Sequence, residues 1–510
     1  MTRRRQNLLA ALVGAVAAVA TLGVAELVAL FVAAGSSPLA AVGGFVIDIV
    51  PPWVKDTAIA LFGTGDKVAL LVGLGLLVLI LALGIGVLQY RRPPLGVAGL
   101  GVVGLVAVLT AVTRSQATPL WALPTILGAA VGILVLVIGT RRLHAWVDAP
   151  PTPASQGLSR RRFVSLLAAS SASAVVVGVT ARIVNSATSA VNVVREALVI
   201  PPPATPAAPV PAAAELDVEG ISPLFTPNAD YYRIDTALQV PRVDTETWRL
   251  RITGMVEEEV EISLDELLAL PLIETAVTLA CVSNEVGGGL IGNAMWTGYP
   301  IRSLLERAKP LAKADMVLSR SVDGFTASTP LDVLTDDRDA IFAVSMNGEP
   351  LPLEHGFPVR MVVPGLYGYV SATKWVTELK LTRFADETAY WTTRGWDAKG
   401  PIKTSSRIDV PRGSASAGTV AVAGVAWAQH TGIEAVEVRV DNGPWREAEL
   451  AEAVSADTWR QWKFAWDAEP GSYVLQVRAT DASGFTQSGT EKFVAPNGAE
   501  GYHTVDVVVG

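Results

Sequence analysis

Five apolar runs in the first 180 residues constrain the fold of this chain more than any other feature. Each is about 17 residues or longer, which is enough for one helical crossing of a bilayer. The whole chain is 50% apolar and only 17% charged, so it is more apolar and less charged than an ordinary soluble protein. The runs are Leu8–Val32, Val68–Leu88, Leu95–Val112, Leu120–Ile138 and Phe163–Val179. We therefore expect residues 1–183 to form a transmembrane region of five helices.

Basic residues are distributed unequally between the two sides of these runs. Ten arginines lie on one side, whereas the basic residues on the other side are Lys55, Lys67 and Arg114. Because positively charged loops stay in the cytoplasm, the N-terminus is predicted to be cytoplasmic. After five crossings, the chain beyond residue 183 is predicted to be extracytoplasmic. The ten arginines are Arg3, Arg4, Arg5, Arg91, Arg92, Arg141, Arg142, Arg160, Arg161 and Arg162.

The last three of these arginines belong to the sequence SRRRFV, residues 159–164, directly before a weakly hydrophobic run. This sequence resembles a twin-arginine export signal, which would here be internal and uncleaved. A basic stop before an ordinary membrane helix is the alternative. The twin-arginine route carries folded proteins, and many of them have already acquired a cofactor. An export signal would therefore imply an extracytoplasmic domain that holds a cofactor.

The expected spans contain few residues with redox or ionic chemistry. The histidines His144, His355, His430 and His503 all lie outside them, so no haem held by two histidines is expected in this chain. Glu26 is the single acidic residue inside a span, and such a residue is a candidate for function. We expect the membrane region mainly to anchor or dock the protein in the lipid bilayer.

The second half of the chain differs from the first in charge. Residues 1–200 carry 15 Lys and Arg against 6 Asp and Glu, a net of +9, whereas residues 201–510 carry 25 against 42, a net of −17. An acidic exterior argues against nucleic acid as a partner, because phosphate backbones are bound by basic surfaces. Residues 184–215, rich in Pro and Ala from residue 201 onward, are expected to be an extended, semi-rigid linker.

Two domains are expected after this linker. Residues 216–403 mix strand-like and helical segments without a regular βαβ rhythm, which is typical of an α+β domain. WRLRITGMV, for example, predicts a strand, and SLDELLALP predicts a short helix that begins at Ser263. Residues 404–510 alternate polar and apolar residues between turn signals such as DNGP and DASG. This pattern predicts a C-terminal β-sandwich of immunoglobulin-like type.

Cys281, in TLACVSNEVGGG, is the only cysteine of the chain and cannot form an internal disulfide. Free cysteines are usually buried, so the residue alone indicates either an inert buried thiol or a single thiolate ligand of a metal. The sequence holds no zinc-type spacing of ligands, no HExxH, no GxSxG and no Walker loop. Zinc, hydrolase and nucleotide chemistry therefore have no support.

Longer segments of the exterior half resemble a known family. MNGEPLPLEHGFPVRMVVPG and the following ATKW, within residues 346–375, form a long and distinctive match. TLACVSNE, WTGYPIRSLL, NADYYRIDTALQVP and VAGVAWAQHTGIEAVEVRVDNGPWREAEL extend the match over both exterior domains. The chain resembles a membrane-anchored bacterial branch of the sulfite oxidase family of molybdopterin-dependent oxidoreductases.

The resemblance implies a fold, a cofactor and a set of contact residues. The fold would be a sulfite-oxidase-like α+β molybdopterin domain, followed by a sandwich that in many relatives pairs two copies as a homodimer. The cofactor would be molybdenum-molybdopterin, with Cys281 as the catalytic residue and molybdenum ligand. Arg360 would bind the cofactor phosphate bidentately. The implied cofactor-binding residues are Tyr232, Arg233, Cys281, Ser321, His355, Arg360, Ala372, Thr373 and Lys374.

Two departures from the family pattern bear on the substrate. Sulfite oxidases typically carry an arginine five residues after the cysteine, where this chain has Val286. Another substrate arginine is expected after an AWS motif, where this chain reads AWAQHTGIEA, with Gln429 and His430. Losing both removes positive charge that would hold sulfite. We therefore expect oxygen-atom transfer on a different small molecule, for example an S- or N-oxide. A sulfite oxidase with an altered anion pocket is the alternative.

The electrons of such a reaction require a second partner. A separate cytochrome or a quinone-linked carrier would exchange them singly with the enzyme. A function of another class is the second alternative. A membrane-anchored binding or sensor module that kept the fold without the cofactor would tolerate the loss of Cys281.

Overall fold

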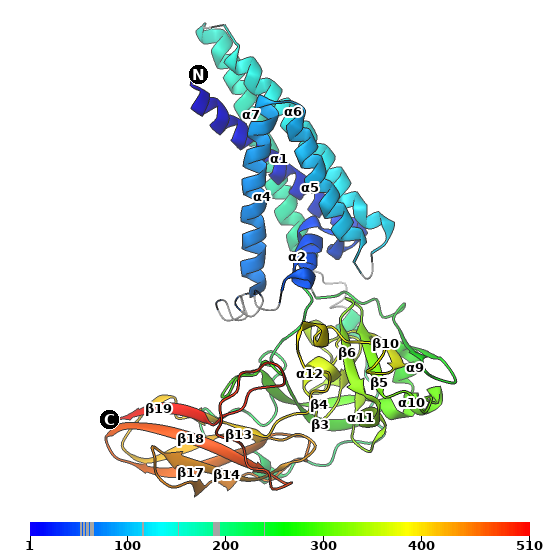
Figure 1. The fold of residues 1–510 in the computed structure, drawn as a ribbon, viewed down its shortest axis with the longest axis vertical. Coiled ribbons are helices and arrows are strands. Elements are labelled where there is room, and N and C mark those ends of the chain that lie inside the picture. Colours follow the sequence, from blue (N-terminus) through cyan, green and yellow to red (C-terminus); the bar gives the residue numbers. More distant parts are fainter. Residues whose placement is uncertain are drawn as a thin grey trace. The chain divides into compact units, whose positions relative to one another are not determined.

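The computed structural model forms two compact units (Figure 1). The first contains residues 1–189 and 236–240, and the second contains residues 190–235 and 241–510. Lys55, one of the basic residues used to predict the topology, lies outside the described residues, as do residues 187–193 of the expected linker. The structure describes residues 1–51, 54, 57, 61, 66–114, 117–150, 152–186, 194–238 and 240–510.

The first unit is built from long apolar helices. Among the described residues, four helical segments are long and apolar enough to cross a membrane, and they coincide with the first four expected spans. The fifth expected span falls within α7, whose side chains are only partly described. The five membrane crossings remain a prediction. The helices are α1 (Arg3–Val32), α2 (Pro38–Ile49), α4 (Asp66–Arg91), α5 (Leu95–Val112), α6 (Leu123–Val147) and α7 (Pro153–Ser186).

Helix α1 packs against α4, α6 and α7. Its contact with α4 is a direct approach of two backbones, because Gly14 faces Ala82 and Gly86 faces Ala10. A Cβ atom on Gly14 would lie 1.9 Å from the carbonyl oxygen of Ala82. Glycine is therefore required there, and small residues of this kind are what allows apolar helices to associate closely.

Two polar residues of this unit differ from their sequence-based descriptions. Glu26 in α1 is not isolated, because the Ser37 hydroxyl at the start of α2 donates to its Oε1 at 2.5 Å. His144, expected beyond the fourth span, lies within α6 because that helix continues to Val147. The expectation that the chain holds no haem remains a prediction.

The first domain of the second unit contains two sheets. One has the strand order β2-β1-β10-β5-β6, and the other has the order β3-β4-β7-β8 with β9 paired to β7. Only β1 and β10 run parallel among these described pairs. The strands are β1 (Arg249–Gly254), β2 (Val260–Ser263), β3 (Ile273–Ala280), β4 (Ile291–Pro300), β5 (Met316–Ser321), β6 (Thr326–Pro330), β7 (Ile341–Met346), β8 (Glu349–Pro350), β9 (Arg360–Val362) and β10 (Val376–Thr382).

Short helices connect these strands where the sequence predicts them. Helix α9 (Leu264–Leu268) begins after Ser263, whose hydroxyl accepts from the Glu266 N–H while the Glu266 carboxylate accepts from the Ser263 N–H. This reciprocal capping explains why the helix starts at that serine. Helix α10 (Ile301–Ala308) follows Pro300. The others are α11 (Leu331–Thr335) and α12 (Gly368–Ser371).

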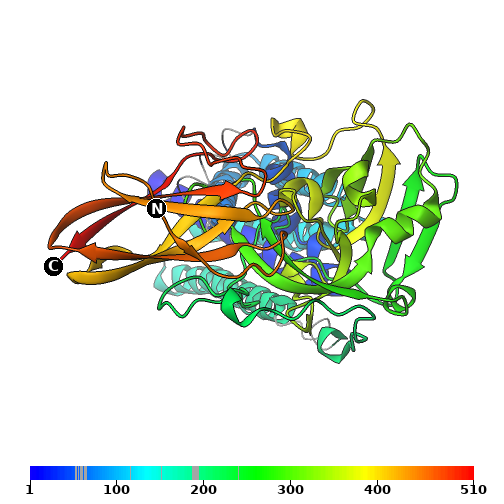
Figure 2. The same ribbon diagram turned by 90° about the horizontal axis from the view of Figure 1, so that it is seen from below.

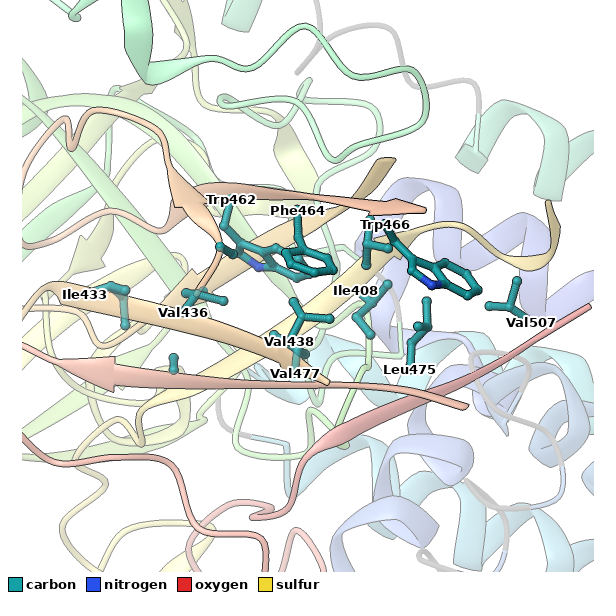
Figure 3. Packing of buried hydrophobic residues seen from close by; sticks show 14 of the residues in the cluster. Ile408, Ile433, Val436, Val438, Trp462, Phe464, Trp466, Leu475, Val477 and Val507 are labelled. Carbon is teal, nitrogen blue, oxygen red and sulfur yellow. The ribbon is translucent and has the colours of Figure 1, made fainter. Parts of the chain in front are cut away.

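The C-terminal domain consists of two packed sheets, with orders β11-β13-β17-β16 and β12-β19-β18-β14-β15. Figure 2 shows their strands running beside one another. Three aromatic residues of β17, Trp462, Phe464 and Trp466, fill the space between the sheets and meet Val438 and Leu475 (Figure 3). The predicted packing of two sheets is present, whereas the immunoglobulin-like class remains a prediction. The longer strands are β11 (Ser405–Val410), β13 (Gly418–Trp427), β14 (Ile433–Val440), β17 (Arg460–Ala468), β18 (Gly471–Asp481) and β19 (His503–Val509), and the short ones are β12 (Gly413–Ala415), β15 (Arg446–Glu447) and β16 (Glu449–Leu450).

The Pro/Ala-rich segment is largely extended and lies along the rest of the second unit. Thr205 forms a parallel bridge with Ile273, at the start of β3. The guanidinium of Arg195 forms an ion pair of 3.1 Å with Glu349. The Glu452 N–H donates to the carbonyl of Ala213 at 2.9 Å. Prolines prevent the segment from forming its own helix or sheet, so its polar backbone groups pair with the domain that it crosses.

Candidate cofactor site

Cys281 lies directly after β3, where the strand ends and the chain turns. Its N–H donates to the Leu290 carbonyl at 2.9 Å, and the Ser283 N–H lies 3.4 Å from its sulfur. The side chain is buried. Burial raises the pKa of the thiol, and the hydrogen bonding from Ser283 partly opposes this shift. The sulfur is therefore held in one position by the turn, as a metal ligand must be.

Arg360 begins β9 and buries its guanidinium. The Nη1, Nε and Nη2 atoms lie 3.1, 3.4 and 3.5 Å from the carbonyl oxygens of His355, Met361 and Ala372, respectively. The guanidinium carbon also lies 5.1 Å from the centre of the Trp296 ring. Burial lowers the pKa of Arg360, and no carboxylate among the described residues forms an ion pair with it. Because a buried charge without a counter-ion is costly, this site suits an anion from outside the chain.

Lys374 places a second cation in the same region. Its Nζ donates to Asp235 Oδ2 at 2.8 Å and to the Glu354 carbonyl at 2.9 Å. Arg233 Nε donates to the same Asp235 oxygen at 2.9 Å. Burial lowers the pKa of Lys374 to about 8, although Asp235 opposes the shift. The Asp235 carboxylate thus pairs with both Arg233 and Lys374. Because Arg360 adds a third cation, the cluster has an excess of positive charge.

His355 and two tyrosines form the apolar side of this cluster. The His355 ring lies edge-on to Tyr231, with 5.5 Å between ring centres, and Tyr231 stacks on Tyr232 at 5.4 Å. Burial lowers the pKa of His355 to about 3, and the charges of Arg360 and Lys374 act in the same direction. The imidazole is therefore neutral near pH 7, with one nitrogen able to donate a hydrogen bond and the other able to accept one.

Ser321 ends β5 and has a buried hydroxyl with no hydrogen-bond partner among the described residues. Ser319, two residues earlier on the same strand face, shares a hydrogen bond of 2.7 Å with the Thr373 hydroxyl. The unpaired hydroxyl therefore faces the side on which Ala372, Thr373 and Lys374 lie. Leaving such a group unsatisfied costs about 1–3 kcal/mol, which a bound polar ligand would offset.

These contacts bring the nine residues singled out from the sequence into one region. Cys281 joins the cluster through Gly368. A Cβ atom built on that glycine would lie 3.8 Å from the Ala280 carbonyl and 4.0 Å from the Tyr232 hydroxyl. The donor set fits molybdopterin chemically, since it combines a soft sulfur ligand, buried cations for a phosphate, and neutral groups for hydrogen bonds. No cluster of three or more His, Cys, Asp or Glu that could hold a metal ion occurs in the described part of the chain.

Comparisons with known proteins identify the family. Residues 237–391 match the family described as the oxidoreductase molybdopterin binding domain. The chain is 30% identical over 333 residues to the mitochondrial sulfite oxidase of Mus musculus, covering 55% of this chain and 59% of that protein. It is 31% identical over 157 residues to the uncharacterised oxidoreductase YuiH of Bacillus subtilis (strain 168), covering 31% of this chain and 76% of that protein. This chain belongs to the sulfite oxidase family of molybdopterin oxidoreductases.

Membership of the sulfite oxidase family makes the protein an oxidoreductase with a molybdopterin-binding domain. The chain spans 59% and 55% of the lengths of the mouse and human sulfite oxidases, somewhat more than half of each. The crystal structure of the sulfane dehydrogenase SoxCD from Paracoccus pantotrophus is also similar, with 24% identity and a TM-score of 0.49, covering 56% of this chain and 81% of that chain.

This member of the sulfite oxidase family carries different residues at the two positions where sulfite-binding arginines were expected. Val286 is a partly buried loop residue. Gln429 is buried, and its Nε2 donates to the Thr278 carbonyl at 3.1 Å. The neighbouring His430 faces a carboxylate, with 3.2 Å between its Nδ1 and Asp457 Oδ1. Val286 and Gln429 carry no charge, so neither can replace an arginine in binding an anion.

Three residues of this region were not predicted from the sequence. Asp235, whose side chain is 4% exposed, pairs with both Arg233 and Lys374. The sequence did contain a clue to this pairing, because Asp235 is an acidic residue two positions after Arg233. Tyr231 orients the His355 ring, and Tyr367 is a buried residue close to Cys281. Nothing in the local sequence marks Tyr367, because its closeness to Cys281 arises only from the fold.

Proposed function

We propose that this protein is a membrane-anchored, extracytoplasmic molybdenum enzyme that transfers an oxygen atom to or from a small neutral substrate. Its substrate class is an S- or N-oxide, or the corresponding reduced compound. One observation carries the proposal. Arg360 is a buried cation in the cluster that Cys281 joins, and no carboxylate among the described residues pairs with it. Val286 and Gln429 stand where arginines are expected to bind sulfite.

Each proposed cofactor contact has a role that matches its surroundings. Cys281 would give its thiolate to molybdenum, and soft sulfur ligands of this kind adjust the potential of a metal. Arg360 would bind the phosphate through two N–H groups, and Lys374 would neutralise the remaining charge. When bound, the cofactor supplies oxygen-atom transfer coupled to a two-electron change at molybdenum. The remaining contacts would come from Tyr232, Arg233, Ser321, His355, Ala372 and Thr373.

The proposed substrate follows from the way charge is used in the site. Arg360 and Lys374 are assigned to the cofactor phosphate, and Val286 and Gln429 offer no positive charge for a doubly charged oxyanion such as sulfite. A neutral oxide needs no such charge, because it carries only partial negative charge on its oxygen. Hydrogen-bond donors are sufficient to recognise it.

The membrane location and the partners extend this proposal. The four long apolar helices support anchoring in a bilayer, and the arginine asymmetry with the SRRRFV sequence supports an exterior catalytic domain. A separate cytochrome or a quinone-linked carrier would exchange electrons with the enzyme. Pairing of two C-terminal sandwiches would give a homodimer.

The first test is the molybdenum and pterin content of the full chain, purified in detergent from a host that makes the cofactor. The wild type should carry about one molybdenum per chain. The Cys281→Ser variant should show a changed molybdenum(V) resonance spectrum, because oxygen replaces sulfur as the ligand. Val282→Ala, at the neighbouring buried position, is the control and should keep the wild-type spectrum.

The same preparations test the substrate. Sulfite oxidation with ferricyanide is compared with the reduction of dimethyl sulfoxide and trimethylamine N-oxide by reduced benzyl viologen. Faster turnover of the oxides supports the proposal, whereas faster turnover of sulfite would favour the sulfite oxidase with an altered anion pocket. A folded wild type with neither molybdenum nor pterin would refute the enzyme proposal and favour the binding or sensor module.

A further inference from the structure

Tyr367 takes no part in the cofactor contacts described above, although the charge of Cys281 acts on its phenol. It directly precedes Gly368, the residue that approaches the carbonyl of Ala280. Its side chain is 6% exposed. The charges of Cys281 and Glu500 both act on the phenol, which places these groups in its surroundings.

The backbone and the hydroxyl of Tyr367 are both held in place. Its N–H donates to the Gly400 carbonyl at 2.7 Å, and the backbone of Lys403 hydrogen-bonds to the phenol oxygen. Gly498 of the C-terminal domain lies directly against the ring. A Cβ atom on this glycine would be 2.5 Å from Tyr367 Oη, and its φ of 101° also favours glycine. The phenol is therefore enclosed by residues from both domains.

Lys403 binds residues 497–500, the segment of the C-terminal domain that lies against Tyr367. Its Nζ donates to Asn497 Oδ1 at 2.9 Å, to the Gly498 carbonyl at 2.8 Å and to Glu500 Oε1 at 2.8 Å. The next residue, Gly501, lies near Val286, since a Cβ atom there would be 3.5 Å from Val286 Cγ2. Residues 497–501 therefore contact both Tyr367 and the position from which the expected sulfite arginine is missing.

The hydroxyl proton of Tyr367 has no acceptor among the residues that the structure describes. Two other buried or partly buried tyrosines nearby do donate: Tyr231 to the Gly292 carbonyl at 2.9 Å and Tyr369 to the Asp397 carbonyl at 2.7 Å. The oxygen of Tyr367 already takes its hydrogen bond from the Lys403 backbone. A donor without an acceptor, on the residue before the glycine that approaches the Ala280 carbonyl, is suited to a bound molecule.

We propose that Tyr367 contacts the substrate and donates a hydrogen bond to the oxygen atom of the S- or N-oxide. The inference rests on the proposed function and deepens it, because it names the group that would recognise a neutral oxide where an arginine would recognise sulfite. The partial negative charge of an oxide oxygen makes it a good acceptor for a phenol. Residues 497–501 of the C-terminal domain act as positioning residues for this donor.

The test replaces Tyr367 with Phe, which keeps the ring and removes the hydroxyl. For reduction of dimethyl sulfoxide and trimethylamine N-oxide by reduced benzyl viologen, kcat/KM should fall about 10- to 100-fold. Molybdenum content should stay at the wild-type level. Tyr369→Phe is the matched control, since its hydroxyl is committed to Asp397, and its kcat/KM should change less than about twofold.

A second readout does not depend on turnover. Dimethyl sulfone, a neutral oxide probe that is not reduced, is titrated while the molybdenum(V) resonance spectrum is recorded. It should bind the wild type about tenfold more tightly than Tyr367→Phe, whereas a residue that only supports the fold would leave this affinity unchanged. Gly498→Ala, which keeps the hydroxyl but displaces the phenol, should also lower kcat/KM with molybdenum retained.

The outcomes separate this inference from the function on which it rests. A wild type without molybdenum refutes the proposed function itself. A loaded wild type that reduces both oxides, with Tyr367→Phe equally active and equally able to bind the sulfone, overturns only the role of Tyr367. If Tyr367→Phe loses its molybdenum, Gly498→Ala decides: a reduced kcat/KM supports the role, and an unchanged kcat/KM overturns it.

Discussion

Replacing Arg360 with Met should remove cofactor binding while leaving the fold intact. Methionine is similar in length to arginine and apolar, so it fills the site without the charge. In the cofactor-free protein the guanidinium is a buried cation without a carboxylate partner in the described part of the chain. Its desolvation costs several kcal/mol. This cost is offset by its contacts with the carbonyls of His355, Met361 and Ala372.

The magnitude follows from these contacts. Only the bond to His355, at 3.1 Å, has a good length, and the other two, at 3.4 and 3.5 Å, are weak. Together they contribute about 3–5 kcal/mol, close to the desolvation cost, so Arg360→Met should change the stability of the cofactor-free protein by less than about 2 kcal/mol. With the cofactor bound, loss of the buried pair costs about 3–5 kcal/mol. Affinity should therefore fall by a factor on the order of 100 to 5,000.

The assay compares the full chain from two hosts, one that makes the cofactor and one that does not. Molybdenum and pterin are counted per chain, and thermal unfolding is followed in detergent. The control is Arg320→Met on β5, whose side chain is 46% exposed and paired with Glu378. It should keep the cofactor. Wild-type cofactor content in Arg360→Met would refute the assignment of Arg360 to the cofactor phosphate. A loss of unfolding free energy above about 3 kcal/mol in the cofactor-free variant would show that the charge of Arg360 supports the fold.

Two further predictions concern pH and the core of the C-terminal domain. Because the pKa of His355 is lowered to about 3, its stabilising effect is complete above pH 6.5 and is lost as pH falls toward 3. Between pH 6.5 and pH 4, the free energy of unfolding of the cofactor-free wild type should therefore fall by roughly 3 kcal/mol more than that of His355→Gln. Melting temperatures measured against pH check this, and parallel curves for the two proteins would contradict it. Trp462→Ala, at a fully buried position, should lower the free energy of unfolding by about 3–5 kcal/mol, whereas Phe493→Ala, at a residue that is 91% exposed, should leave denaturation nearly unchanged. Equal losses for the two variants would show that the packing of the sandwich is not what stabilises it.

Local patterns were sufficient for most secondary structure. A capping box has a fixed spacing, so Ser263 marked the start of α9 in advance. Alternation along β17 and β18 marked two strands whose apolar faces meet in one core. The helices that are long and apolar enough to cross a membrane were evident from length and composition alone. For the Pro/Ala-rich segment, sequence shows that prolines extend a chain but not which surface the extended chain contacts.

The sequence by itself determined that this protein has an apolar, arginine-flanked region followed by an acidic second half with a family-type cysteine and arginine. These properties depend on residue type and spacing, which the chain carries without folding. Only the tertiary structure decided that Asp235 is shared by Arg233 and Lys374, and that Tyr367 meets Gly498. Such contacts join residues up to 139 positions apart, and their geometry arises from how sheets and domains pack. No local pattern in the chain encodes that packing.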